Sequence, residues 1–167
     1  MHAFLVIFFR WLHVTTACVA IGGAFFMRIL LPAGLGELEP EARRAAFLKI
    51  RRIFKMVIHT CILFLLVSGI YNSMGNWAIY NTIPQTAQPL WGTHVLLATA
   101  IFAIGIYALI GKEPQGKDAN WMLVMLLLML AATGVAAGLK YVRDNRPLPA
   151  TTTPTLAARL ETLFHLE

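Results

Sequence analysis

Between Met56 and Gly111 the sequence contains no Asp, Glu, Lys or Arg, and this absence of charge limits what the chain can fold into. Surface helices of water-soluble proteins carry a polar face, whereas a helix that crosses a bilayer needs about 20 mainly apolar residues. Hydrophobic residues make up 58% of the 167 residues, and the 13% that are charged gather between apolar runs. The sequence therefore predicts an all-α integral membrane protein.

Four apolar segments are long enough to cross a membrane. The predicted spans are approximately Phe4–Leu31, Ile53–Ser73, Leu90–Gly111 and Asn120–Tyr141. Asn72, Gly75 and Asn76 are predicted to end the second span, so that residues 74–89 form a loop before the third. Because short connections join antiparallel neighbours, we expect a four-transmembrane-helix antiparallel bundle.

Outside these spans, two segments need separate interpretation. The charged segment Glu37–Lys55 is predicted to be partly helical, and to form a solvated loop or a helix lying at the membrane interface. Residues 1–145 form the predicted transmembrane domain, and residues 146–167 form a linker and a short amphipathic C-terminal segment. In that segment the apolar side chains share one helical face, which would lie on the membrane or dock a partner: Leu156, Leu160, Leu163 and Phe164.

Basic residues are distributed unequally between the two ends of the predicted bundle. Nine lie near one end, namely Arg28, Arg43, Arg44, Lys49, Arg51, Arg52, Lys55, Lys112 and Lys117, and five near the other, namely Arg10, Lys140, Arg143, Arg146 and Arg159. The positive-inside rule then predicts a multi-pass protein of a bacterial-type inner membrane with both termini outside. An aromatic belt is expected at the outer side, formed by Trp11, Trp77, Tyr80 and Trp91. Orientation and lipid headgroups explain the positive charge, so no nucleic-acid partner is predicted.

Three histidines, His13, His59 and His94, each lie inside a different apolar span that contains no carboxylate to pair with them. A polar ring in hydrocarbon is costly without a partner, which makes each ring a candidate functional residue. Neutral imidazole is a common iron ligand. His13 and His94 both fall toward the outer side, at depths that differ by roughly 7 Å. We therefore predict one haem b with His13 and His94 as its axial ligands.

His59 lies toward the inner side, more than about 10 Å from His13 along the membrane normal. It could hold a second haem with a ligand from elsewhere in the chain or from a neighbouring protomer. Alternatively, it donates a hydrogen bond to a backbone carbonyl or lines a quinone pocket. Arg10, Lys140 and Arg143 lie near the predicted outer haem, where they could bind its propionates or anchor the helices at the interface.

Several short motifs resemble those of a known family. The resemblance is carried by WLH at 11–13 and IGGAFF at 21–26, which are similar to the first helix of the copper-resistance protein D (CopD) superfamily and of HemJ-type protoporphyrinogen oxidases. Later helices add SGIYN at 68–72 and GTHVLL at 92–97. In the HemJ-type family a first-helix histidine, matched here by His13, and a lysine on a later helix are associated with haem b. This chain departs from the pattern, since His94 stands where that lysine is expected.

Together these observations favour a membrane b-type cytochrome that transfers electrons to or from a quinone or a redox partner protein. One alternative is a protoporphyrinogen-oxidase-like haem enzyme. Another is a copper transport or copper-handling membrane protein that uses Cys18, Cys61 and methionines. A fourth interpretation is a structural subunit whose histidines are satisfied by hydrogen bonds. Any of these could be a homo-oligomer, and the motifs of common soluble enzymes are absent from the sequence.

Overall fold

The computed structural model describes residues 2–110 and 118–146. Helix α1 (His2–Phe25) continues through a π-helical turn, η1 (Phe26–Leu30), into the short α2 (Leu31–Gly34), and is followed by α3 (Pro40–Thr82), α4 (Pro84–Ile110) and α5 (Asp118–Asp144). Four segments are long and apolar enough to cross a membrane: Ala3–Gly34, Pro40–Thr82, Gln85–Tyr107 and Asn120–Asp144. The predicted all-α class with four spanning helices is confirmed, whereas the predicted amphipathic segment, Leu156–Phe164, lies outside the described residues.

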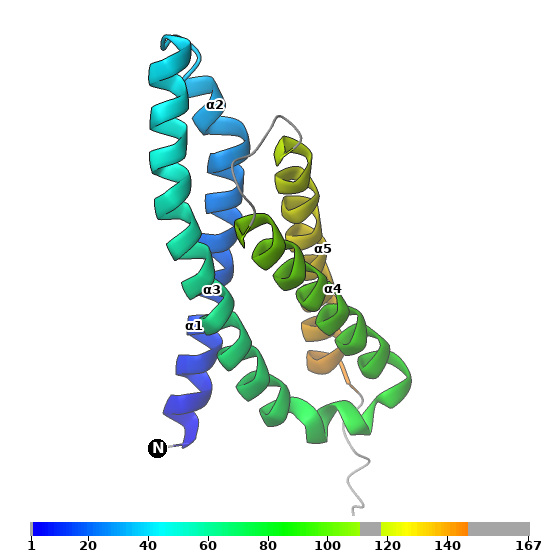
Figure 1. Ribbon diagram of the computed structural model, residues 1–167. Coiled ribbons are helices and arrows are strands. Elements are labelled where there is room, and N and C mark those ends of the chain that lie inside the picture. The colour runs from blue at the N-terminus through cyan, green and yellow to red at the C-terminus, as the bar shows by residue number, and fades with distance from the viewer. Residues whose placement is uncertain (1, 111–117, 147–167) are drawn as a thin grey trace, which may run out of the picture.

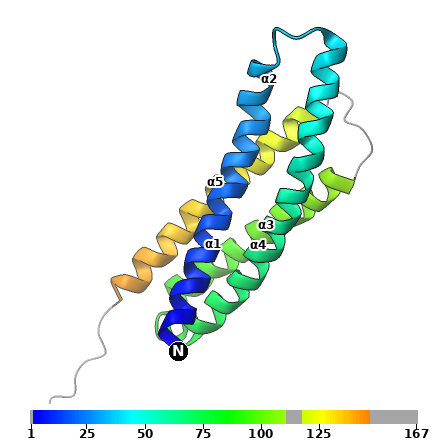
Figure 2. The ribbon, with the colours of Figure 1, turned by 90° about the vertical axis from the view of Figure 1, so that its left-hand side faces the viewer.

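The helices form two antiparallel pairs, α1 with α3 and α4 with α5 (Figure 1). The N-terminus, the turn between α3 and α4 and the end of α5 lie at one end of the bundle, which we call the N-terminal end. The connection from α2 to α3 lies at the other end, which we call the α2 end, and there the α1–α3 pair extends beyond the start of α5 (Figure 2).

Polar side chains on exposed helical faces bond to their own helix. Thr60 Oγ1 donates to Met56 O at 3.1 Å, and Thr99 Oγ1 donates to Val95 O at 2.9 Å. Hydrocarbon offers no partner for hydroxyl or backbone groups, so a spanning segment must satisfy them internally. These hydroxyls therefore need no partner outside the chain.

Helix α3 begins earlier than the predicted second span. The prediction that Glu37–Lys55 is partly helical is confirmed, but the segment is neither a loop nor a separate helix, because residues from Pro40 onward belong to the same continuous helix as the span. Proline is well placed in a first helical turn, where its missing N–H leaves no bond unmade. Arg43 stabilises the preceding turn, since its Nη2 donates to Gly36 O at 2.6 Å and to Leu38 O at 3.1 Å.

Helix α3 also ends later than predicted. Asn72, Gly75 and Asn76 were expected to terminate the span, but all three lie inside the helix. The side chain of Asn76 bonds to its own helix, donating from Nδ2 to Asn72 O at 2.6 Å. An amide that finds a carbonyl one turn earlier does not have to compete with the helix for its backbone groups.

The predicted loop over residues 74–89 is therefore wrong. Only Ile83 separates α3 from α4, and Pro89 lies within α4 instead of preceding it. Ile83 N still donates to Tyr80 O at 3.3 Å, and Ala87 N donates to Ile83 O at 3.0 Å, so the turn keeps its backbone bonded. A tight turn of this kind fixes α3 and α4 as antiparallel neighbours.

Glycine allows α1 and α3 to approach closely. A Cβ atom placed on Gly23 would lie 2.8 Å from Cε2 of Phe54, whose ring is buried in the core. Gly22, the preceding residue, would meet nothing within 4 Å. The core at this level is formed by small and flexible apolar side chains: Ala20, Ala24, Met27, Ile58, Cys61, Ile101, Met125 and Met129.

We expect Gly23→Val to destabilise the fold by about 1–3 kcal/mol, because the added atoms collide with a buried ring. Gly22→Val is the matched control, since its side chain would point into open space. Thermal unfolding of both variants in detergent measures the difference. Equal melting temperatures for the two variants would contradict this account of the α1–α3 contact.

Candidate functional site

Packing of the two helix pairs brings His13 and His94 together. His13, on α1, has its Nδ1 2.9 Å from Ser68 Oγ on α3, and a Cβ atom on Gly69 would lie 3.3 Å from its Cε1. His94, on α4, has its Nδ1 3.1 Å from Ala132 O on α5. Both rings are partly buried, and they are close enough to interact electrostatically. Each helix pair therefore contributes one imidazole to the same region.

The hydrogen bonds to Ser68 and to Ala132 both involve the Nδ1 atom of a histidine ring, and the ring of His13 also interacts with the backbone carbonyl of Leu65. Because a carbonyl oxygen can only accept, His94 Nδ1 carries the hydrogen and donates to Ala132 O, which leaves a lone pair on Nε2 of the neutral ring. Across residues 2–110 and 118–146, Nε2 of His13 and Nε2 of His94 have no hydrogen-bond partner. An imidazole anchored through one nitrogen, with the other available, is typical of metal-ligating histidines.

The structure keeps His59 away from this pair. His59 precedes Ser68 by nine residues on α3, which is about 14 Å along the helix axis. Its side chain is exposed, and its Nδ1 donates to Lys55 O at 2.7 Å. Among the described residues, no group of three or more His, Cys, Asp or Glu side chains could hold a metal ion. The three histidines thus form one pair and one separate residue.

A polar layer lies between the histidine pair and the N-terminal end of the bundle. Arg143 Nη1 on α5 donates to Asn76 Oδ1 on α3 at 3.3 Å, and the Arg143 side chain is only 16% exposed. Tyr80, which is buried, interacts electrostatically with both Arg143 and Arg10. Arg10 and Arg143 therefore approach the same tyrosine from different helix pairs.

Two residues of this region, Lys140 and Tyr80, have surroundings that differ from those the sequence predicts. Lys140 Nζ pairs with Asp144 Oδ2 at 2.5 Å, and its side chain is 69% exposed. Tyr80 was expected in the aromatic belt but is 6% exposed and belongs to the core. Trp77 and Trp91 do lie together, in an edge-to-face contact with ring centroids 5.4 Å apart.

Ser68, Asn76 and Tyr80 were missed as site residues in the sequence. Ser68 could have been found, because it is a hydroxyl within an apolar run at the depth that antiparallel packing assigns to His13. Tyr80 and Asn76 could not, because they lie beyond the predicted end of the second span. The hydrogen-bond acceptor for His94 is a backbone carbonyl. Every residue has such a group, so the sequence could not identify this one.

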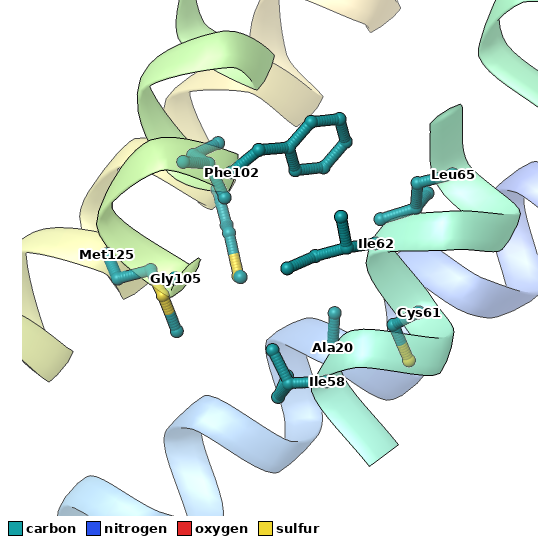
Figure 3. A pocket seen from close by; sticks show the side chains of 10 residues that line it. Ala20, Ile58, Cys61, Ile62, Leu65, Phe102, Gly105 and Met125 are labelled. Carbon is teal, nitrogen blue, oxygen red and sulfur yellow. The ribbon is translucent and has the colours of Figure 1, made fainter. Parts of the chain in front are cut away.

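An apolar cavity lies between the helices on the α2-end side of the histidines (Figure 3). Its lining residues Ala20 and Ile101 follow His13 and His94 by seven positions each, which is about 10 Å along the helices. Its volume is about 260 Å³, counting the space open at its mouth. Ile62 of α3 points toward Phe102 and Gly105 of α4 across it. Leu65 and Met129 also line it, each one turn from a residue that bonds a histidine ring. The histidine pair thus lies between a cationic layer and an apolar cavity.

No protein-family model, curated protein or solved structure matches the chain. The fold and the site define its class directly. It is a multi-pass membrane protein of four long apolar helices, in which two antiparallel helix pairs each hold one of two neighbouring histidines.

We expect cysteines at positions 13 and 94 to be joined by a short bifunctional thiol reagent. The test protein carries His13→Cys and His94→Cys with Cys18→Ala and Cys61→Ala, so that no native thiol competes. The control protein carries His59→Cys in place of His94→Cys, and we expect no cross-link between positions 13 and 59. Cross-linking is read as a mobility shift in denaturing gels after cleavage between the helices. Efficient linkage of 13 to 59 and none of 13 to 94 would overturn the arrangement described here.

Proposed function

We propose that this protein is a membrane cytochrome of b type that holds one haem between its two helix pairs, with His13 and His94 as the axial ligands. The proposal depends on one observation, which is that both rings are anchored through Nδ1 and have no partner for Nε2 among the described residues. Two neutral imidazoles are a standard ligand set for haem iron, and they leave no open position for a substrate. Such a centre is suited to electron transfer.

The surroundings of the pair match the two unlike edges of a haem. Carboxylate propionates need cationic partners, and Arg10 and Arg143 lie toward the N-terminal end of the bundle, near Tyr80. The apolar edge of the macrocycle needs apolar contacts, which the cavity offers on the opposite side of the pair. Lys140 and Arg143 both pair with Asp144, but the Lys140 side chain is 69% exposed, whereas the Arg143 side chain is 16% exposed and reaches Asn76 inside the bundle. We therefore assign the propionates to Arg10 and Arg143.

When bound, the haem would supply reversible one-electron chemistry. The residues of the chain would hold and orient it: the imidazoles ligate, the arginines neutralise the propionates, and the apolar side chains exclude water. We propose that the electron partner is a quinone or a redox protein, and that the site lies near the outer side of a bacterial-type inner membrane. The resemblance of the first-helix motif around His13 to HemJ-type proteins supports a haem within the membrane, whereas the resemblance to the CopD superfamily would suggest copper handling.

Two alternative functions have less support. A protoporphyrinogen-oxidase-like enzyme needs a binding place for a tetrapyrrole substrate in addition to the haem, and the apolar cavity is already assigned to the apolar edge of the haem. A copper carrier would need converging sulfur ligands, yet Cys61 is buried whereas Cys18 is exposed. A second haem at His59 has less support, since the ring of His59 is exposed and its Nδ1 donates to Lys55 O within its own helix.

Purified protein should show a low-spin b-type spectrum when the dithionite-reduced and oxidised forms are compared. We expect His13→Ala and His94→Ala each to abolish it, because each removes an iron ligand. His59→Ala should keep one haem per chain, measured by pyridine haemochrome. A colourless protein that contains one copper per chain would contradict the haem assignment.

Removal of one propionate partner should weaken haem binding without preventing it. We expect Arg143→Gln to lower haem affinity roughly tenfold, since one charge-assisted hydrogen bond is lost. Lys140→Gln is the matched control on the same helix and should have little effect, because its ammonium pairs with Asp144 at the surface. Haem titration of the metal-free protein compares the two variants. Equal losses would indicate a general effect of charge and not a specific contact.

A further inference from the structure

Ser68 carries a fully buried hydroxyl in an apolar part of α3. Its exposed fraction is 0%, and its Oγ makes two short contacts, 2.5 Å to Phe64 O and 2.9 Å to His13 Nδ1. A buried hydroxyl is costly unless it is hydrogen-bonded. Both contacts are therefore expected to be real hydrogen bonds, and the number of available hydrogens decides their direction.

The direction follows from a count of donors. A serine hydroxyl has one hydrogen to donate and lone pairs with which to accept. Phe64 O can only accept, so the Ser68 hydrogen is used in that bond. Ser68 Oγ must then accept from His13, which requires the hydrogen of the neutral ring to be on Nδ1. The lone pair is consequently on Nε2.

We propose that Ser68 is a positioning residue that selects the Nδ1–H tautomer of His13 and so presents the Nε2 lone pair to a metal. The assignment of the tautomer follows from the hydrogen bonds. The statement that Nε2 binds a metal rests on the proposed function. Neutral imidazole in water favours the Nε2–H tautomer, in which the outward nitrogen cannot bind a metal. Gly69 leaves room for the imidazole ring of His13, because a Cβ atom on Gly69 would lie only 3.3 Å from Cε1 of His13.

The two ligands differ in how they are held. His94 donates to a backbone carbonyl, which no side-chain substitution can remove. His13 donates to a side chain, and the backbone carbonyl of Leu65 also interacts with its ring. Ser68→Ala would therefore remove the hydroxyl acceptor of Nδ1 and leave the Leu65 carbonyl in place. A hydrogen bond from Nδ1–H makes the imidazole a stronger donor to the metal. Because a stronger donor stabilises ferric over ferrous iron, Ser68 would lower the midpoint potential of the haem.

The tautomer can be measured without any cofactor. We would record ¹⁵N spectra of histidine-labelled, metal-free full-length protein in nanodiscs, with the His13 signals identified by their loss in His13→Gln. The wild type should show a protonated Nδ1 and an unprotonated Nε2. Ser68→Ala should move His13 toward the Nε2–H form. Ser73→Ala should not, although it also removes a hydroxyl from α3, because that hydroxyl accepts from Trp91 instead.

An Nε2–H or charged His13 in the wild type would overturn the inference, and so would an unchanged tautomer in Ser68→Ala. A second test of the inference uses the haem-bound protein. We expect Ser68→Ala to lower haem affinity about 10- to 100-fold and to raise the midpoint potential, whereas Ser73→Ala changes neither. If the wild type binds no haem, the proposed function fails while the nitrogen spectra still decide the tautomer. Circular dichroism of each variant verifies that the helices are intact.

Discussion

The hydrocarbon of a bilayer supplies no hydrogen bonds, and this constraint accounts for most of what the chain does with its polar groups. Backbone groups pair within helices, and the hydroxyls of Thr60 and Thr99 pair with carbonyls one turn earlier. The imidazoles cannot satisfy both of their nitrogens in this way. Each uses Nδ1 within the protein, and for His13 and His94 no hydrogen bond of Nε2 is found among the described residues.

The same constraint separates the site into zones. Arg10 and Arg143 lie toward the end of the bundle, where charged groups can reach water, and the apolar cavity lies deeper. A histidine pair between these zones is matched to a ligand with one charged edge and one apolar edge. This order along the bundle is the one that the proposed haem would require, because its propionates are charged and its opposite edge is apolar.

Particular residues show how much of the fold and of the candidate site the sequence predicts. The depth argument places His13 and His94 at the same end of the bundle, and the structure brings them together. Their role as ligands stays a prediction. The argument failed for α3, because Asn76 donates to its own helix and Asn72 donates to Phe9 O on α1, so neither amide competes for the backbone bonds of α3. Propensity is a weak guide where tertiary contacts compensate.

By itself, the sequence determined the four apolar helices, their antiparallel order and the depth of each histidine, because hydrophobic length and the rise per residue are properties of a single segment. Only the tertiary structure decided which groups hold those histidines. The serine that accepts from His13 comes from a helix 55 positions away in the chain, and the acceptor for His94 is a carbonyl on another helix. Such partners are selected by the rotation of each helix about its axis, which packing between helices sets.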